Sequence, residues 1–130
     1  MLWKRIKIRP RERALLFKDG CLDEILSPGE YRFLVTSAES LTVERHSIRD
    51  PVFQGIWADH VMRKRPDLVR HHFTCVETRE TQVALVYLDD QLFTVLLPAK
   101  RILFWRNASR VRTEIVDLTA EQEMTEAASA

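Results

Sequence analysis

The sequence repeats itself when it is shifted by 70 residues: the segment from Trp3 to Ile48 aligns with the segment from Phe73 to Leu118 without a gap. Nine of the aligned positions are identical, and others exchange one apolar residue for another, as Ile25 is replaced by Val95. A solenoid would need three or more short units, and this period is long and occurs only twice. The pattern indicates a duplicated supersecondary unit, so the two copies are expected to share one backbone plan.

The shared positions read as strands and turns. Residues 3–8 alternate apolar and basic side chains, which predicts a half-buried strand. Residues 13–18 form a nearly continuous apolar run, typical of a strand covered on both faces. Asp19-Gly20 predicts a hairpin turn, because glycine accepts the positive φ that such a turn needs. Further strands are expected over residues 21–26, 31–36 and 41–48, and again in the second copy.

The second copy keeps the plan but changes the turn residues. Asp89-Asp90 replaces Asp19-Gly20, and Ala99 replaces Gly29. Alanine and aspartate adopt positive φ less readily than glycine, so these turns are either of a different type or strained. The strand over residues 102–105 is bulkier than its counterpart, which places it deep in a core or in a surface that meets another domain.

A helix is predicted between the copies. Asp50 is a suitable N-cap, and Pro51 suits the first helical position. Apolar residues then recur at helical spacing from Val52 to Val61, and Pro66 is expected to end the helix. Residues 67–72 are expected to add a short second helical turn. The predicted fold is mainly β (α+β), with two related antiparallel β lobes joined by a central helix. Its parts are residues 1–48, a connector over 49–72, residues 73–118, and a tail over 119–130 that is disordered or begins a helix.

The bulk composition excludes several classes of protein. A net charge of +1 argues against a nucleic-acid binder, and no apolar run approaches the roughly 18 residues needed to span a bilayer. No secretory signal follows Met1, and Cys21 and Cys75 fall at unrelated places in the two copies. Free thiols and a cytoplasmic location are therefore expected.

No pattern of residues in the sequence requires a catalytic function. The histidines His60, His71 and His72 lack metal-ligand spacing and are expected to be solvated or partly buried. Glycines occur singly, so there is no phosphate-binding loop. We expect no catalytic residues, no cofactor and no metal.

Two sets of residues are candidates for contact with a protein partner or with lipid. The basic N-terminal strand carries Lys4, Arg5, Lys7, Arg9 and Arg11, which suit an anionic membrane or an acidic partner, although a solvated strand face has the same pattern. The large aromatic residues are expected to lie mostly in the core. Trp57 or Trp105, if exposed, would mark an interface.

The repeated phrase resembles a known family. Residues 12–20, followed by Ile25-Leu26-Ser27-Pro28-Gly29-Glu30-Tyr31, are similar to the opening of the stomatin/prohibitin/flotillin (SPFH, or Band 7) domain. The closer likeness is to bacterial slipins, some of which carry this phrase twice, and it extends through Leu103-Phe104-Trp105 to about Leu118. A full slipin continues into the rest of the SPFH domain, and the residues that carry the resemblance are not expected to include the hydrophobic hairpin by which many stomatins hold the membrane.

The resemblance implies a non-enzymatic scaffolding module, peripheral at the bacterial inner membrane, that binds protein partners, self-associates or regulates a membrane protease. One alternative is a soluble protein-binding adaptor with no membrane role. Another is a small β-domain enzyme or ligand carrier with a deep pocket. The copies agree on strands but not on charges, since Lys18 aligns with Leu88 and Arg32 with Ile102. The first copy is therefore expected to face solvent or lipid, and the second to face a core or a partner.

Overall fold

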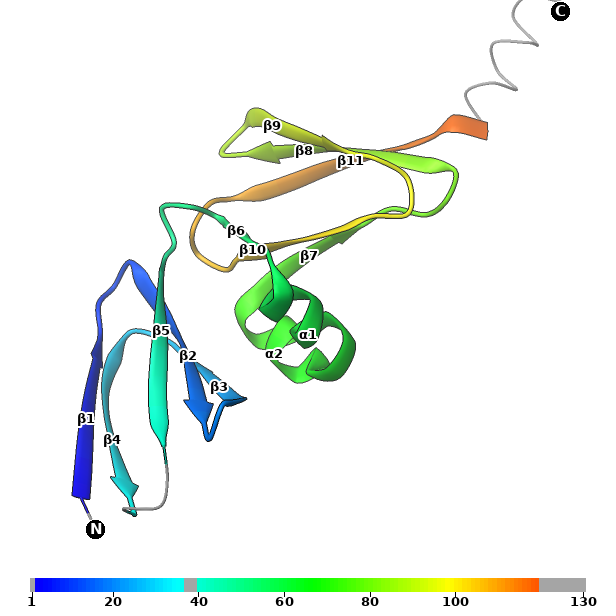
Figure 1. The fold of residues 1–130 in the computed structure, drawn as a ribbon. Helices are drawn as coiled ribbons and strands as arrows, with labels where there is room; N and C mark the ends of the chain where they lie inside the picture. Colours follow the sequence, from blue (N-terminus) through cyan, green and yellow to red (C-terminus); the bar gives the residue numbers. More distant parts are fainter. Residues whose placement is uncertain (1, 37–39, 120–130) are drawn as a thin grey trace, which may run out of the picture. The chain divides into compact units, whose positions relative to one another are not determined.

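The computed structural model describes residues 2–36 and 40–119 and divides into two compact units, residues 1–50 and 51–130 (Figure 1). The first unit contains β1 (Leu2–Ile8), β2 (Glu12–Lys18), β3 (Cys21–Leu26), β4 (Gly29–Val35) and β5 (Leu41–Ser47). The second unit contains β6 (Val52–Phe53), α1 (Ile56–Lys64), α2 (Pro66–His72), β7 (Phe73–Glu77), β8 (Gln82–Leu88), β9 (Gln91–Leu96), β10 (Arg101–Trp105) and β11 (Val111–Asp117). The strands pair antiparallel, so the prediction of a mainly β fold with antiparallel sheets is confirmed.

In the first unit, a two-stranded ribbon of β1 and β4 packs on a three-stranded sheet in the order β3-β2-β5. Alternate residues of β1, Ile6 and Ile8, point inward and are almost fully buried, as the period-two pattern predicts. They join a core cluster that includes Ala14, Leu16, Leu26 and Leu41. The ribbon therefore has an inner face on the core and an outer face away from it.

In the second unit, two three-stranded sheets, β6-β10-β7 and β11-β8-β9, enclose a core cluster formed by Val76, Ala84, Val86 and Phe104. The other side of the first of these sheets carries three stacked or tilted aromatic rings, those of Phe53, Phe73 and Trp105, with centroids 4.5–5.0 Å apart. The helices α1 and α2 lie on that side of the sheet, away from β8, β9 and β11 (Figure 1). β10 is thus a deeply buried central strand, which was one of the two expected outcomes for residues 102–105.

The pairing of three strands recurs with the period of the sequence repeat. Leu15 of β2 lies opposite Ile25 of β3 and Glu44 of β5, and the aligned Leu85 of β8 lies opposite Val95 and Glu114. A bulge falls after Leu16 in the first unit and after the aligned Val86 in the second. The prediction that both copies share a backbone plan is therefore confirmed for β2, β3 and β5 and their counterparts.

The first hairpin turn also recurs, although its residues change. Asp19 and Gly20 have φ values of 50° and 79°, and Asp89 and Asp90 have values of 50° and 67°. Both residues of each turn are left-handed, as a two-residue hairpin of this type requires. The second copy was expected to have either a turn of a different type or a strained turn. At Asp90 the turn has the same type and is strained, because a residue with a Cβ atom replaces glycine.

The second turn follows the other alternative. Ala99 has a φ of 56°, whereas the aligned Gly29 has a φ of 148°. The pairing that follows also differs: Ile6 lies opposite Tyr31, but Val76 lies opposite Ile102, one residue beyond the aligned position. The ribbon of β7 and β10 is therefore shifted by one residue relative to the ribbon of β1 and β4.

The predicted start of the helix is wrong. Val52 and Phe53 form β6 and pair with β10, and α1 begins at Ile56 after Gly55, whose φ is +106°. A β-branched and an aromatic residue suit a strand, and the carbonyl of Pro51 accepts a hydrogen bond from the backbone of β10. The short second helix is confirmed as α2, with Pro66 in its first turn. Residues 120–130, which hold almost all of the predicted tail, lie outside the described residues.

Candidate functional site

The outer face of the β1–β4 ribbon is the most unusual surface of the first unit. It consists of the residues of both strands that point away from the core, and the pairing register places them in three directly opposed pairs. These pairs are Trp3 with Leu34, Arg5 with Arg32, and Lys7 with Glu30. Side chains opposed in this way across an antiparallel pair lie within contact distance.

One end of this face is apolar and exposed. Trp3 is 69% exposed and Leu34 is 48% exposed, although both are large hydrophobic residues. The large aromatic residues were expected to lie mostly in the core, and Trp3 is an exception because its strand position directs it outward. An exposed tryptophan beside an exposed leucine is typical of a surface that contacts another apolar phase or a partner.

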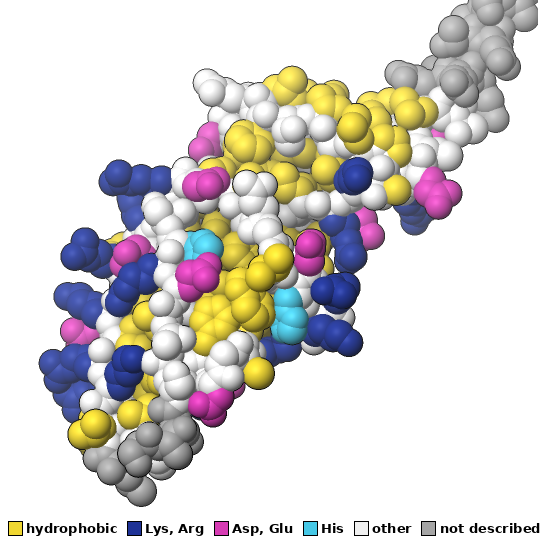
Figure 2. All heavy atoms as spheres, in the orientation of Figure 1, with side chains coloured by type: hydrophobic (Ala, Val, Ile, Leu, Met, Phe, Trp, Pro, Cys, Tyr) yellow, Lys and Arg dark blue, Asp and Glu magenta, His cyan; other side chains and the backbone are white. Residues whose placement is uncertain are grey.

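The middle of the face is cationic. Arg5 and Arg32 are both exposed and directly opposed, an arrangement in which like charges destabilise a sheet. Figure 2 shows Lys and Arg side chains gathered along the side of the first unit where β1 lies. An anion that binds between two like cationic charges reduces the repulsion between them, so this arrangement favours an anionic ligand.

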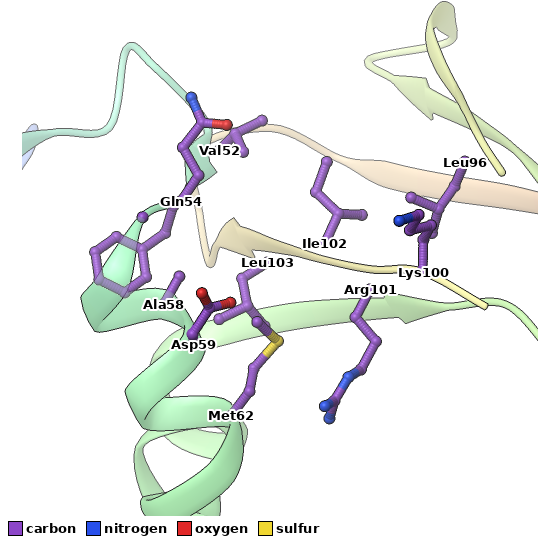
Figure 3. Close-up of a pocket in the computed structure, with 12 residues that line it drawn as sticks. Val52, Gln54, Ala58, Asp59, Met62, Leu96, Lys100, Arg101, Ile102 and Leu103 are labelled. Atoms are coloured by element: carbon purple, nitrogen blue, oxygen red, sulfur yellow. The ribbon is translucent and has the colours of Figure 1, made fainter. Parts of the chain in front are cut away.

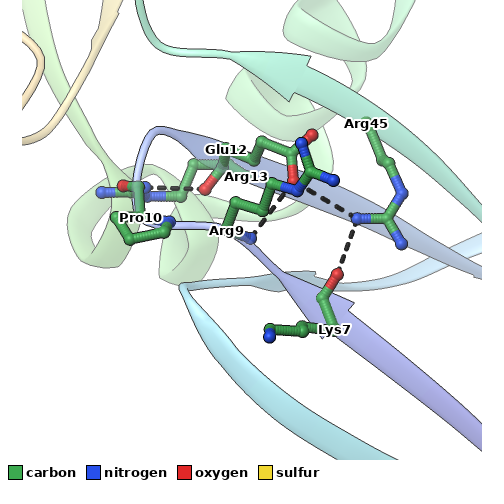
Figure 4. Close-up of polar contacts among 6 residues, drawn as sticks. All are labelled: Lys7, Arg9, Pro10, Glu12, Arg13 and Arg45. Carbon is green, nitrogen blue, oxygen red and sulfur yellow. Dashed lines mark hydrogen bonds and ion pairs between the residues drawn. The ribbon is translucent and has the colours of Figure 1, made fainter.

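The cationic surface continues into a hollow of about 360 Å³ lined by Lys7, Arg9, Glu12 and Arg45. Figure 4 shows the polar contacts among these residues. Arg45 donates a hydrogen bond to the carbonyl of Lys7 at 2.8 Å and lies 3.5 Å from a carboxylate oxygen of Glu12. The same carboxylate oxygen accepts a bond of 3.1 Å from the backbone N–H of Arg9. Three cations against one carboxylate leave an excess of positive charge in this hollow.

The structure separates the remaining basic residues of the sequence prediction. Lys4 points to the other side of β1, where its ammonium donates to the carbonyl of Leu41. Arg11 lies in the exposed turn between β1 and β2, and its carbonyl accepts a bond from Ile48. The predicted basic strand is therefore a cationic face formed by Arg5 and Lys7, which is joined by residues that the sequence prediction did not include.

The two predicted tryptophans are not part of this face. Trp105 is 2% exposed and packs on Phe53 and Phe73, so it is a core residue of the second unit and unavailable to a partner. Trp57 is half-buried on α1, and its ring makes a T-shaped contact with the ring of His60, with the two centroids 5.4 Å apart. The sequence prediction did not include Trp3, Arg32, Leu34 and Arg45. The signal for Trp3, Arg32 and Leu34 was that they occupy outward-pointing positions of two paired strands.

The second copy treats the same face differently. Phe73 occupies the position aligned with Trp3, but it is 1% exposed because the aromatic cluster lies on that side of β7. The helices α1 and α2 lie there too (Figure 1). The outer face of the ribbon is thus covered in the second unit and open in the first.

The second unit has its own hollow of about 250 Å³, with a mixed lining (Figure 3). Asp59 and Met62 of α1 approach it from one side, and Lys100 and Arg101 approach it from the start of β10. Its volume lies below the range of about 300–1,000 Å³ that is usual for small-molecule sites.

The thiols and histidines do not form a metal site in the described parts of the chain. Among residues 2–36 and 40–119, no three His, Cys, Asp or Glu side chains are placed to hold a metal ion. Although Cys75 is exposed, partial desolvation raises the pKa of its thiol, the carboxylate of Glu77 raises it further, and Arg101 opposes the shift. A thiol with a raised pKa is a poor nucleophile at neutral pH.

No helix in the described residues combines the length and apolar character needed to cross a bilayer. Comparison of the chain with protein-family models, with curated proteins and with solved structures finds no match. The likeness to slipins therefore stays a prediction from the repeated phrase.

Proposed function

We propose that this chain is a non-enzymatic binding module that contacts an anionic membrane surface through the outer face of the β1–β4 ribbon. The observation that carries the proposal is the directly opposed Trp3–Leu34 and Arg5–Arg32 pairs on a face that is open to solvent. Tryptophan and leucine insert at the boundary between lipid headgroups and acyl chains. Arginines next to them bind lipid phosphates and gain from the negative surface potential.

The setting of this module follows from the resemblance to slipins. We propose two related β lobes, joined by the helical segment, that act as a scaffold at the inner face of a bacterial membrane. Binding of protein partners, such as a membrane protease that the scaffold regulates, belongs to the same proposal. Contact with the membrane is peripheral, through the surface of a ribbon.

Sedimentation with lipid vesicles tests the proposal. The chain should sediment with vesicles that contain phosphatidylglycerol and should stay in the supernatant with purely zwitterionic vesicles. Binding should weaken as salt rises from low to physiological concentration, because exposed charges are screened over a Debye length of about 8 Å at physiological salt. Trp3→Ser should weaken binding by removing the inserted ring.

A matched control is available in the second unit. Trp57 is half-buried on α1 and lies outside the ribbon, so Trp57→Phe should leave vesicle binding unchanged. Absence of binding to anionic vesicles at low salt would contradict the membrane proposal and leave the soluble adaptor as the better interpretation.

A further inference from the structure

Strand β9 has an edge that lacks the usual protection against pairing. In the described part of the chain, β9 pairs with β8 only and forms one edge of the β11-β8-β9 sheet. Its sequence from Gln91 to Leu97 contains no charged residue and no proline. Leu92 is 57% exposed, Phe93 47% and Val95 44%. A long apolar edge of this kind is a template for pairing with another strand.

The counterpart of β9 in the first unit shows what protection looks like on the same backbone. β3 has the same bulge and the same register as β9, but it carries Asp23 and Glu24. Asp23 forms an ion pair with Lys18 at 3.7 Å. The aligned positions in the second unit are Phe93 and Thr94, so the second copy has no charge at this edge.

The opposite edge of the same sheet is protected. β11 carries Arg112, Glu114 and Asp117, and Arg112 bonds to Glu114 at 3.1 Å. Charged residues on an edge strand oppose the approach of a second strand. The sheet therefore has one edge that can pair and one edge that resists pairing.

We propose that β9 pairs antiparallel with β9 of a second copy of this chain, which joins two β11-β8-β9 sheets into one six-stranded sheet. A two-fold axis at the centre of β9 makes the contact self-complementary. An uncharged edge meets its own copy without repulsion, whereas it offers no charge by which to select an acidic or basic partner. The dimer is closed, because pairing uses both uncharged edges and leaves only the charged β11 edges outside.

The side chains of β9 support this contact. Leu92 lies opposite Tyr87, and Val95 lies opposite Leu85, so both point to the outer face of the sheet despite the bulge between them. In an antiparallel pair of identical strands, residues of one face meet residues of the same face. Leu92 of each copy would then lie opposite Val95 of the other copy and be covered by it. This inference concerns the second unit and does not depend on membrane binding.

Sedimentation equilibrium of the whole chain, without lipid, tests the proposal. The wild-type chain should show a reversible monomer–dimer equilibrium. Val95→Lys and Leu92→Glu should each raise the dimer Kd about tenfold or more, because a charge then lies opposite an apolar side chain of the other copy. An equimolar mixture of these two variants should regain the dimer, because the introduced ammonium and the introduced carboxylate then lie opposite each other. This recovery would show that the variants are folded.

Ile115→Lys is the control, because Ile115 is exposed on β11 at the protected edge and the variant should dimerise as the wild type does. The proposal is overturned if the wild type stays monomeric up to about 1 mM, which corresponds to a binding free energy weaker than about −4 kcal/mol. It is also overturned if Val95→Lys dimerises as tightly as the wild type, if the mixture fails to associate, or if the wild type forms species larger than a dimer.

Discussion

Replacing Arg32 by glutamate is expected to stabilise the first unit and to weaken its binding to anionic membranes. Arg32 lies directly opposite Arg5 in the β1–β4 ribbon, and both side chains are exposed. Directly opposed side chains contribute about 0.2–1 kcal/mol, favourably for opposite charges and unfavourably for like charges. Arg32→Glu replaces an unfavourable pair of like charges with a favourable pair of opposite charges. The free energy of unfolding should therefore rise by about 0.5–1 kcal/mol.

The effect on membrane binding has the opposite sign. Each lysine or arginine near an anionic bilayer contributes about 1 kcal/mol to binding, and Arg32→Glu changes the charge by two units. A loss of about 1–2 kcal/mol corresponds to a 5- to 30-fold weaker partition coefficient. Arg32→Gln, which removes one charge, should lower it about fivefold.

Urea unfolding followed by circular dichroism, together with vesicle sedimentation at low salt, measures both effects on the same samples. Arg63→Glu makes the same charge change on the exposed side of α1 in the second unit and should leave vesicle binding nearly unchanged. Unchanged binding of Arg32→Glu would refute the reasoning. Weaker binding together with lower stability would refute it as well, since the loss would then come from damage to the fold.

Three further predictions concern the second unit. Ala99→Gly should leave stability unchanged or raise it by up to about 1 kcal/mol in urea unfolding, because glycine relieves a φ of 56° at some cost in chain entropy. Trp105→Ala should lower the free energy of unfolding by about 3–5 kcal/mol, since the ring is almost fully buried. Trp57→Ala should lower it by less, because that ring is only half-buried. Cys75 should react with iodoacetamide more slowly in the folded than in the unfolded chain at pH 8. Its raised pKa leaves less thiolate there, and the difference should shrink as the pH rises through that pKa.

The strand pattern could be read from the sequence because local rules and the duplication agree. Alternation in β1, the apolar run of β2 and the Asp19-Gly20 turn each specify one local structure, and the second copy repeats them at the same spacing. The start of α1 could not be read in this way. Val52 and Phe53 fit the spacing of a helical stripe, but their pairing with β10 is a long-range contact that no local pattern reveals.

The candidate surface was only half visible from the sequence for the same reason. The basic residues of β1 are plain in the sequence, but Arg32 and Leu34 join them only through the register of β4, which pairs residues 21 to 33 positions apart. Trp3 looked like a core residue because tryptophan is usually buried, and its exposure depends on which face of β1 meets the core. The uncharged edge of β9 became informative only when the structure showed that β3 and β9 have the same pairing and bulge.

The depth of Trp3 in a bilayer tests the central claim most directly. Tryptophan fluorescence should be measured with anionic vesicles whose acyl chains carry bromine, which quenches only rings that reach the acyl-chain region. The account predicts quenching and a blue shift for the wild-type chain, and loss of both in Trp3→Phe, because Trp105 is buried in the protein and Trp57 lies outside the ribbon. Bound protein whose fluorescence is not quenched, or is quenched equally in Trp3→Phe, would contradict the account.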